Sequence, residues 1–392
     1  MFVFLSFARA AQDPPSATAH SGATFATLSA QADAARNTDR LDEAIPLYKK
    51  ALALRPGWAE GWWSLGTIQY DRSSYEEAGG AFLKVVALAP TNGTAYVMLG
   101  LSEFELGRDD LALKHIVKGE NLGLDTDPEL RHVALYHQGV LLQRQGEFQA
   151  ARETLEQLCR QGVQSDEIAI ALGMTLLRER GKNPPVPGSA DAEIVAQVGH
   201  AACLAGQKKF DEARMVLSAA IGQYPKYPAI HYAFGLILTE ASDLPAAVAE
   251  FKREIENNPA DVVSRLQIAA ATYKTDSAAG IPYAEEAVKL APQQPFSHYL
   301  LGMLLLDTDN DEKAIPELET AQKAFPRETR IYLALGTAYS RTGRKQDAAR
   351  ARAMFQRLTE EGKKAGAQTE VGSADDGKIP FDDVLSPKPP QP

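Results

Sequence analysis

Cysteine is scarce in this chain. Its 392 residues include only two, Cys159 and Cys203. Two cysteines cannot build a disulfide framework, and neither has the C-x2-C spacing that is typical of a zinc site. We therefore expect both to be small packing residues in different repeats of the fold.

Motifs that carry catalysis are absent as well. The sequence has no phosphate-binding G-x4-G-K-[ST] loop, no G-x-S-x-G turn and no H-E-x2-H motif. The nearest pair of histidines, His132 and His137, is five residues apart, which places the two on different faces of a helix. The sequence thus predicts no catalytic residue, no metal site and no cofactor, and we expect that the chain is not an enzyme.

Clustered positive charge and long apolar runs are missing too. The chain has 41 basic and 51 acidic residues and a formal net charge of −10. Because phosphate binding relies on clustered Lys and Arg, this balance argues against nucleic acid as a partner. No run of about 18 apolar residues occurs, so the sequence predicts no membrane span.

What the sequence has instead is a repeat of 34 residues. Gly66 and Gly100 are 34 residues apart, and so are Gly302 and Gly336. Six prolines follow the period in two runs: Pro56 and Pro90, 34 residues apart, and, after a break, Pro225, Pro259, Pro292 and Pro326 at steps of 34, 33 and 34. A period of about 20 to 50 residues marks a stacked repeat array.

Each recurring residue type has a physical reason. Glycine inside a helix costs about 1 kcal/mol relative to alanine, but its missing side chain lets a partner helix approach closely. Proline ends the second helix of a unit because it has no amide hydrogen to donate. Alanine recurs at the matching contact of the second helix, at Ala78, Ala151, Ala213, Ala247, Ala314 and Ala348.

The best single unit runs Trp62-x2-Leu65-Gly66, then Ala78-x3-Phe82, then Pro90. It resembles the tetratricopeptide repeat, whose pattern is W-x2-L-G-x2-Y, A-x3-F and P, although the expected Tyr falls one place before Tyr70. The resemblance implies an all-α fold, an α-solenoid of antiparallel helix pairs wound as a right-handed superhelix. In such an array each unit packs mainly on its neighbours.

We count about nine two-helix repeats and one unpaired helix. Residues 166–180 read as a first helix with its own Gly173, but the helix-breaking segment 181–188 follows it. In the next unit, Gly199 and Ala213 fit their places only if the turn at 206–210 is about two residues longer than usual. We therefore predict an N-terminal sub-array, 21–180, a linker, 181–192, and a C-terminal sub-array, 193–360.

The two ends are expected to lie outside the array. Residues 1–20 read as a leader, and Ala8-Arg9-Ala10 is similar to a signal-peptide cleavage site, although the usual basic start is missing. We interpret the leader as a truncated signal peptide and expect a periplasmic or extracellular protein; if it is only a short hydrophobic leader, the protein is cytoplasmic. Residues 361–392 form a proline-rich tail with few large apolar groups, which favours disorder over docking.

Two short polar motifs are expected to be structural. Asp309 and its acidic neighbours are similar to the start of a calcium loop, but Glu312 stands where glycine is needed and Leu318 where a carboxylate is needed. We interpret the segment as a turn between the two helices of one repeat. Asn92 begins a glycosylation sequon, but we expect it to cap a helix.

The resemblance also implies a binding surface. In this family the first helix of each unit lines a concave groove, and the residues one, five and eight places after the aromatic position point inward. Mapped onto this sequence, the predicted groove residues are Trp63, Tyr70, Val97, Leu101, Phe104, Tyr136, Val140, Met174, Tyr232, Tyr299 and Met303. Contiguous apolar surface usually marks an interaction site. The alternative is a tighter winding that buries some of these side chains against neighbouring helices.

The function implied is that of a non-catalytic scaffold from a bacterial cell, which binds a partner polypeptide in this groove. One subclass of the family grips C-terminal carboxylates with basic residues, but none of the matching positions here is basic: Ser29, Asp33, Ser64, Thr94 and Met98. An amphipathic helix or an extended peptide is therefore the expected ligand. The alternatives are a self-associating structural protein and an accessory or substrate-recruiting subunit of an enzyme, secretion or cell-envelope assembly system.

Overall fold

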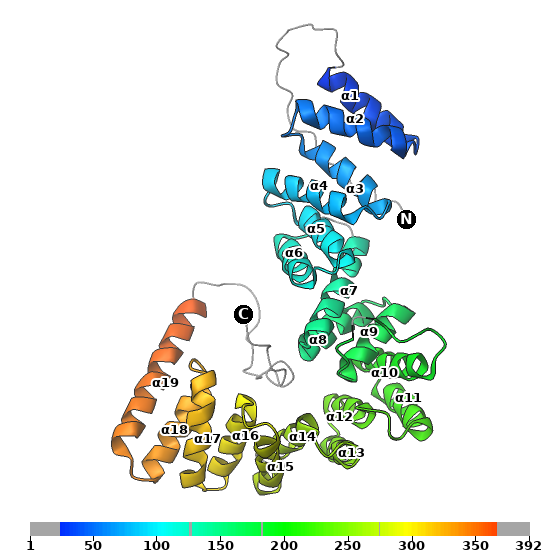
Figure 1. The fold of residues 1–392 in the computed structure, drawn as a ribbon. Helices are drawn as coiled ribbons and strands as arrows, with labels where there is room; N and C mark the ends of the chain where they lie inside the picture. The colour runs from blue at the N-terminus through cyan, green and yellow to red at the C-terminus, as the bar shows by residue number, and fades with distance from the viewer. Residues whose placement is uncertain (1–23, 125–127, 182, 274, 367–392) are drawn as a thin grey trace. The chain divides into compact units, whose positions relative to one another are not determined.

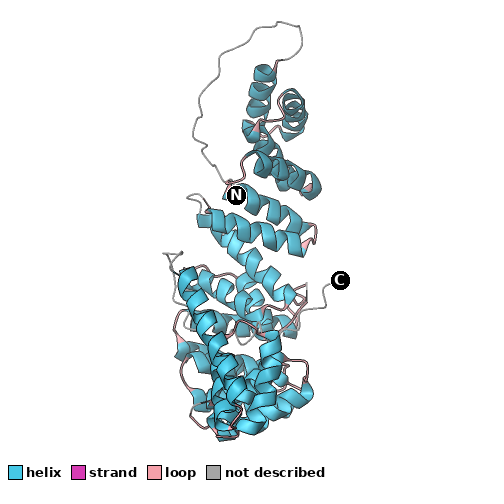
Figure 2. Cartoon of the chain, turned by 90° about the vertical axis from the view of Figure 1, so that its left-hand side faces the viewer, coloured by secondary structure: helices cyan, strands magenta, loops and turns pink. Residues whose placement is uncertain are grey.

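Helices account for all the regular structure in the described part of the chain. The computed structural model describes residues 24–124, 128–181, 183–273 and 275–366, which form nineteen helices and no strand (Figures 1 and 2). Within each of the two compact units of the chain, helices that follow one another in sequence pack side by side. This confirms the predicted all-α array of helix pairs.

The chain divides into two compact units between Arg108 and Asp109. The first unit contains α1 (Phe25–Asn37), α2 (Leu41–Leu54), α3 (Ala59–Asp71), α4 (Tyr75–Leu88) and α5 (Gly93–Glu105). The second contains α6 (Asp109–Leu122), α7 (Pro128–Gln145), α8 (Phe148–Arg160), α9 (Asp166–Leu176), α10 (Ala190–Gly206), α11 (Phe210–Gln223), α12 (Ile230–Glu240), α13 (Leu244–Asn257), α14 (Val262–Thr272), α15 (Ser277–Leu290), α16 (Pro295–Asp307), α17 (Asp311–Ala324), α18 (Thr329–Arg341) and α19 (Lys345–Gly366).

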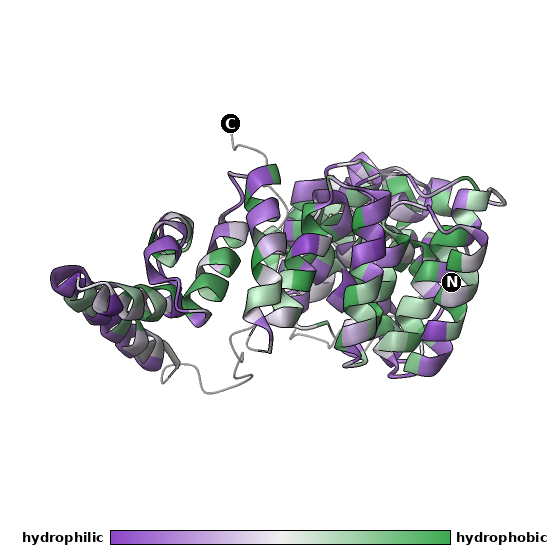
Figure 3. Ribbon diagram, turned by 90° about the horizontal axis from the view of Figure 1, so that it is seen from below, coloured by the Kyte–Doolittle hydropathy of each residue, from purple (hydrophilic) through white to green (hydrophobic). Residues whose placement is uncertain are grey.

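The helix pattern is amphipathic in most of these elements. Figure 3 shows hydrophilic and hydrophobic residues following one another along the same helices. The apolar side faces the neighbouring helices, as an array without a single central core requires. An exception is α12, whose residues 230–238 are all buried.

The repeat prolines stop the second helices as expected. Each of six second helices ends two residues before a repeat proline; α4, for example, ends at Leu88 before Pro90. The carbonyl of four of these prolines accepts a hydrogen bond from the first helix of the next repeat. The pairs are Trp62–Pro56 and Tyr332–Pro326, both 2.8 Å, His231–Pro225 at 3.0 Å and His298–Pro292 at 2.9 Å. One register position therefore links consecutive repeats through different donor side chains.

Two places after each of the first helices α1, α3 and α5, a residue has left-handed backbone geometry. These residues also recur with the period of 34. The angle φ is 58° at Asp39, 58° at Ser73 and 69° at Gly107. After Ser73, the amide of Ser74 donates to the carbonyl of Gln69 at 2.8 Å. This arrangement satisfies carbonyls that a helix end would otherwise leave open, and it turns the chain into the second helix.

The glycine of a first helix faces the bulky residue of its second helix. A Cβ atom added at Gly66 would lie 2.9 Å from the Phe82 ring, and one at Gly302 would lie 2.7 Å from Leu318 Cγ. Real side chains do not come so close, so a larger residue would push the helices apart. Gly336, in the last repeat, has more room, since the nearest atom would lie 3.4 Å away.

The pair α9 and α10 departs from the predicted register. A Cβ at Gly199 would collide with the backbone of Ala169 and Gly173 on α9, so this glycine serves the contact with α9. The turn between α10 and α11 spans only residues 207–209, as short as the turn at 72–74, so the expected longer turn is wrong. With the usual spacing of twelve residues, seen from Gly66 to Ala78, Ala201 takes the glycine place opposite Ala213.

The helices on the two sides of the predicted linker pack directly on each other. One hydrophobic cluster of the second unit includes residues from Leu135 to Ala351, and both α9 and α10 belong to it. The described chain divides at Arg108 rather than at 181–192. The reason is that Gly173 and Gly199 bring the backbones of α9 and α10 together, which leaves segment 181–188 as a largely exposed connection.

The predicted boundaries of the leader and the tail differ from the bounds of the described helices. The leader, residues 1–20, lies outside the described residues, and so do residues 367–392 of the tail. Residues 361–366, however, still belong to α19. Ion pairs from Arg357 and Arg327 to Glu361, at 2.9 and 3.1 Å, support this extension of the helix.

Candidate functional site

In the first unit, the predicted groove residues come from α3 and α5. Trp63 packs edge-on against Phe82 of α4, with ring centres 5.5 Å apart, and Tyr70 packs edge-on against Tyr75 at 5.3 Å. Both side chains are half-buried. Burial, reinforced by the nearby Glu105 carboxylate, raises the pKa of the Tyr70 phenol to about 12, so Tyr70 stays neutral.

The three α5 residues differ in exposure. Val97 and Leu101 are buried, whereas Phe104 is half-buried. The helix begins at Asn92, whose side chain accepts a hydrogen bond from the Ala95 amide at 2.9 Å, which confirms the predicted cap. Within this unit, Trp63, Tyr70 and Phe104 therefore keep some accessible apolar surface.

In the second unit, the predicted groove residues separate into buried and half-buried sets. Met174, Tyr232 and Tyr299 are buried, and Tyr232 is only 2% exposed. The half-buried residues are Tyr136, Val140 and Met303. Together with Val97 and Leu101 of the first unit, the three buried residues make five. The side chains of five of the eleven predicted groove residues are thus almost inaccessible to a partner.

The Arg178 side chain, which follows α9, contributes to the burial of Tyr232. The Arg178 guanidinium, just after α9, lies over the rings of Phe148 (4.8 Å) on α8 and Tyr232 (5.7 Å) on α12. Tyr232 also packs on Phe251 with ring centres 6.0 Å apart. Tyr232 is thus enclosed by an aromatic ring of its own repeat and by a side chain that follows α9.

A more open surface lies at the C-terminal end of the array. We name four side chains at inward register positions of α14, α16 and α18 the C-terminal inner face: Tyr273, Met303, Leu306 and Leu333. The first three are half-buried, and Leu333 is 54% exposed. Helices α14, α16 and α18 contact one another in turn. Leu333 was missed in the sequence analysis, although the rule that selected Trp63 and Tyr299 selects it when extended to the ninth repeat.

Ionic contacts join consecutive repeats along one edge. In four places an arginine at the end of a first helix pairs with an acidic residue at the start of the preceding second helix. The pairs are Arg72–Asp42, Arg108–Glu76 (2.6 Å), Arg144–Asp109 (3.2 Å) and Arg341–Asp309 (2.9 Å). Since Arg108 ends the first unit and Asp109 begins the second, each pair lies within one unit.

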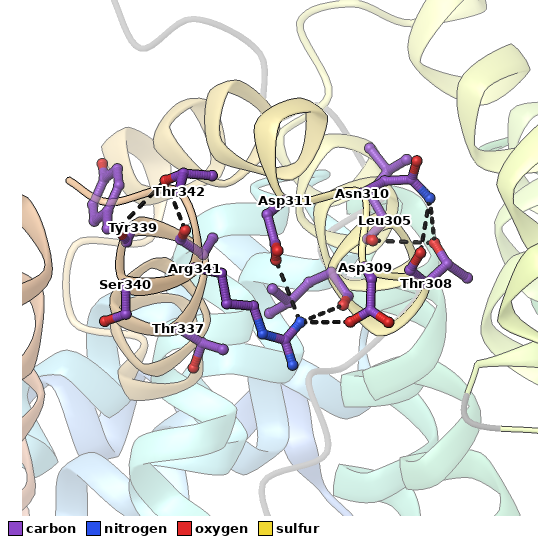
Figure 4. Close-up of polar contacts among 12 residues, drawn as sticks. Leu305, Thr308, Asp309, Asn310, Asp311, Thr337, Tyr339, Ser340, Arg341 and Thr342 are labelled. Carbon is purple, nitrogen blue, oxygen red and sulfur yellow. Dashed lines mark hydrogen bonds and ion pairs between the residues drawn. The ribbon is translucent and has the colours of Figure 1, made fainter.

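The last of these contacts accounts for the segment that is similar to a calcium loop. Figure 4 shows the Arg341 side chain pointing at this turn, where Nη1 lies 2.9 Å from Asp309, 3.4 Å from Asp311 and 3.4 Å from the Leu306 carbonyl oxygen. The segment is the turn between α16 and α17, as predicted. A cation supplied by the protein itself thus neutralises it. Within the described ranges, no three His, Cys, Asp or Glu side chains are placed to hold a metal ion.

The two cysteines are the clearest correction to the sequence analysis. Cys159 of α8 and Cys203 of α10 form a disulfide, with Cα atoms 5.3 Å apart. They were expected to be small packing residues because they lie in different repeats and neither has the spacing of a zinc site. The irregular helix α9 brings α8 and α10 into contact, and no spacing rule for cysteines contains that information.

A buried ionic cluster lies on α8 beside the disulfide. Arg152 forms ion pairs with Glu240 of α12 and, at 3.8 Å, with Glu156. Burial raises the pKa of Glu156 to about 7, against the lowering effect of Arg152, and the Glu240 carboxylate raises it further. The Arg152–Glu240 ion pair therefore connects the fourth repeat, which contains α8, directly to α12, although α9 lies between them in the sequence.

Family comparisons agree with the repeat pattern. A family model described as tetratricopeptide repeat matches residues 29–93 and 204–262, and a second model with that description matches residues 133–161. The chain therefore contains tetratricopeptide repeats at these residues. A model described as bacterial transcriptional activator domain matches residues 241–371.

The similar curated proteins are much longer than their aligned parts. Human protein O-mannosyl-transferase TMTC3 is 29% identical over 122 residues, which cover 31% of this chain and 13% of that protein. The peroxisomal targeting signal receptor of Candida albicans is 33% identical over 98 residues, which cover 24% of this chain and 17% of the receptor. The chain thus matches less than a fifth of the length of either relative.

Solved structures of low identity were also found. MamA 41-end from Desulfovibrio magneticus RS-1 is 21% identical, covers 44% of this chain and 96% of its own, and has a TM-score of 0.39. Yeast Tom70 is 13% identical, covers 86% of this chain and 84% of its own, and has a TM-score of 0.35. Separately, none of the helices in the described residues combines the length and the hydrophobicity that crossing a bilayer requires.

Proposed function

We propose that this protein is a non-catalytic scaffold that binds a partner polypeptide along the inward side of its first helices. Repeats of this family imply protein partners. The observation that carries the proposal is the C-terminal inner face, where Leu333 is more than half exposed beside the half-buried Met303 and Leu306. Apolar side chains held on rigid helices at a regular spacing suit an amphipathic helix or an extended peptide.

The chain supplies a matched pair of leucines for the test. Leu333 lies at an inward position of the first helix α18, and Leu83 lies on the second helix α4; each is 54% exposed. A peptide ligand would first be selected from a displayed random library against the full chain. Its affinity for Leu333→Asp and Leu83→Asp would then be measured by titration, with circular dichroism as the folding control.

The scaffold proposal expects the Leu333→Asp variant to lose at least about tenfold in affinity, as truncation of a central interface residue typically does. The Leu83→Asp variant should bind like the wild type. Equal affinities of the two variants, with unchanged helicity, would remove the C-terminal inner face as the binding surface.

Export is a second part of the proposal. The apolar leader and Ala8-Arg9-Ala10 suggest it, and the Cys159–Cys203 disulfide supports it, because disulfides form and persist mainly in oxidising compartments. Mass spectrometry of the protein from its native cells would test export. An N-terminus near Ala11 and a mass consistent with an intact disulfide are expected; a retained leader with two free thiols would contradict export.

The match of residues 241–371 to a bacterial transcriptional activator domain favours a second candidate, a protein related to transcriptional activators. With a net charge of −10, we expect this chain not to bind nucleic acid itself. Fluorescence anisotropy with labelled duplex DNA separates the two candidates. Salt-dependent binding at physiological ionic strength would favour the activator. A captured partner with catalytic or secretory activity would instead favour the role of an accessory or substrate-recruiting subunit.

A further inference from the structure

The disulfide encloses the one irregular part of the repeat array. Cys159 lies near the end of α8 and Cys203 near the end of α10. The chain between them consists of α9, the connection that includes 181–188, and most of α10. Both cysteine side chains are buried. The covalent bond therefore fixes the two helices that hold α9 in place.

Helix α9 depends on its surroundings for order. It has only 11 residues, and an isolated helix shorter than about 12–15 residues is marginal in water. It has no second helix of its own and packs against α7, α8 and α10. Its contact with α10 is backbone to backbone at Gly173 and Gly199, so the fit is lost if α10 moves away.

The C-terminal end of α9 connects further elements. The Glu179 carbonyl accepts a hydrogen bond from the Gln143 side chain of α7. The Glu179 carboxylate accepts one from the Tyr227 hydroxyl, at 3.4 Å, in the segment before α12. With the Arg178 contacts to Phe148 and Tyr232, this end bridges α7 and α8 to α12.

A polar contact also joins α8 to the residue that follows α10. The Gln207 side chain, just after α10, donates to the Cys159 carbonyl at 3.0 Å, next to the cross-link. The connection on the other side of α9 contains Pro184, Pro185, Pro187 and Gly188, which form no helix. Segments with exposed backbone and few partners open at low free-energy cost.

We propose that the Cys159–Cys203 disulfide is a redox-controlled lock on α9. When the bond is intact, α9 stays packed on α7, α8 and α10, and Arg178 stays over the Tyr232 ring; when the bond is reduced, α9 and its connection open locally while the rest of the array stays folded. Formation oxidises two thiols to one disulfide and releases two protons. The two electrons pass to a low-molecular-weight or protein disulfide, which becomes two thiols; a dithiol or a phosphine reductant supplies electrons for the reverse step.

The test is hydrogen exchange of the full chain, followed by mass spectrometry. The oxidised protein is compared with protein reduced by a phosphine, and alkylation confirms that both thiols are free. Exchange of the α9 amides should rise by more than about tenfold on reduction, because closing a loop of this size typically stabilises by more than one decade in equilibrium constant. Amides of α16 should be unchanged, and protease cleavage within 181–188 should accelerate in parallel.

The double variant Cys159→Ser, Cys203→Ser is the matched control, and it should exchange rapidly in α9 with or without reductant. If this variant does not fold, the comparison of the oxidised with the reduced wild-type chain still tests the proposal. Unchanged α9 exchange with both thiols alkylated would overturn the lock. Equal acceleration in α9 and α16 would also overturn it, since the disulfide would then act on global stability. Failure of oxidised glutathione to restore protection to the reduced protein would contradict the reversible step.

Discussion

The inward register positions of two regions behave differently although the residues are similar in kind. Around α9, Tyr232 is almost completely buried, with Arg178 over its ring and Phe251 packed beside it. In the last repeat Leu333 remains more than half exposed, although Tyr299, at the same register position one repeat earlier, is buried. The accessibility of a repeat position is thus decided by what stacks beside it, and the residue type alone does not determine it.

Glycine substitutions should sharpen this comparison most strongly. Gly199→Ala places a Cβ against the rigid backbone of α9, so we expect a loss in the free energy of unfolding of about 3 kcal/mol or more. Gly336→Ala meets only Arg352 at 3.4 Å, which can move, and should gain up to about 1 kcal/mol from better helix propensity. Urea titration followed by circular dichroism measures both. Similar losses in the two variants would show that the α9 region is not packed more tightly than the last repeat.

Two Arg→Ala variants test the same contrast between the two regions, because each removes the cation of an ion pair. Arg152 joins Glu156 and Glu240 in a largely buried cluster, so Arg152→Ala should cost about 3 kcal/mol by leaving Glu240 without this cation, whereas Glu156 keeps its pair with Arg160. Arg341 pairs with Asp309 at the surface, and Arg341→Ala should cost less than about 1 kcal/mol. Thermal unfolding of both variants at low and high salt gives the comparison. If Arg152→Ala lost as little stability as Arg341→Ala, and if salt changed that loss, the result would argue against a buried cluster at Arg152.

The pH dependence of stability should carry a signature of the α8 cluster. Glu156 has a pKa of about 7 in the folded chain, above its ordinary value of 4.5. The folded state therefore binds more protons than the unfolded state between these values, and stability should fall as pH rises from about 4.5 to 7. Glu156→Gln should flatten this part of the profile. An unchanged slope in that variant would exclude Glu156 as the source.

His231 should act at a higher pH and with a smaller effect. Burial lowers the pKa of His231, but hydrogen bonds to the Glu250 carboxylate (2.6 Å) and the Pro225 carbonyl outweigh burial, with further help from the Glu254 charge, so the pKa is raised. The stabilisation is then complete below the ordinary pKa of 6.5 and is lost as pH rises through the raised value.

A tyrosine replacement tests this assignment. The Glu250 partner of His231 also pairs with Arg253, at 2.6 Å. Tyr332 already donates to Pro326 at the same register position, so His231→Tyr should keep a donor and remove the pH dependence above 6.5. The measurement is the unfolding midpoint from pH 6 to 9. An identical decline of the midpoint in the wild type and the variant would contradict the assignment.

The sequence predicted the parts of the fold that repeat. Pro90 marks a helix end, Gly66 faces Phe82, and the first and second helices follow from the period because each device acts between adjacent residues or adjacent helices. The disulfide could not be predicted, because Cys159 and Cys203 lie in different repeats and meet only through the packing of α8 on α10. The burial of Tyr232 was missed for the same reason, whereas Leu333 follows from the period alone.

Oxidation of methionines by hydrogen peroxide tests the difference between the two regions most directly, because the wild-type chain contains all the probes. Met174 of α9 is 5% exposed, Met303 of the C-terminal inner face is half-buried, and Met215 of α11 is 65% exposed. Peptide mass spectrometry over time should show Met215 oxidised fastest, Met303 next and Met174 slowest. Oxidation of Met174 as fast as that of Met303 in the disulfide-bonded protein would contradict an inner surface that is closed at α9 and open at the C-terminal repeats.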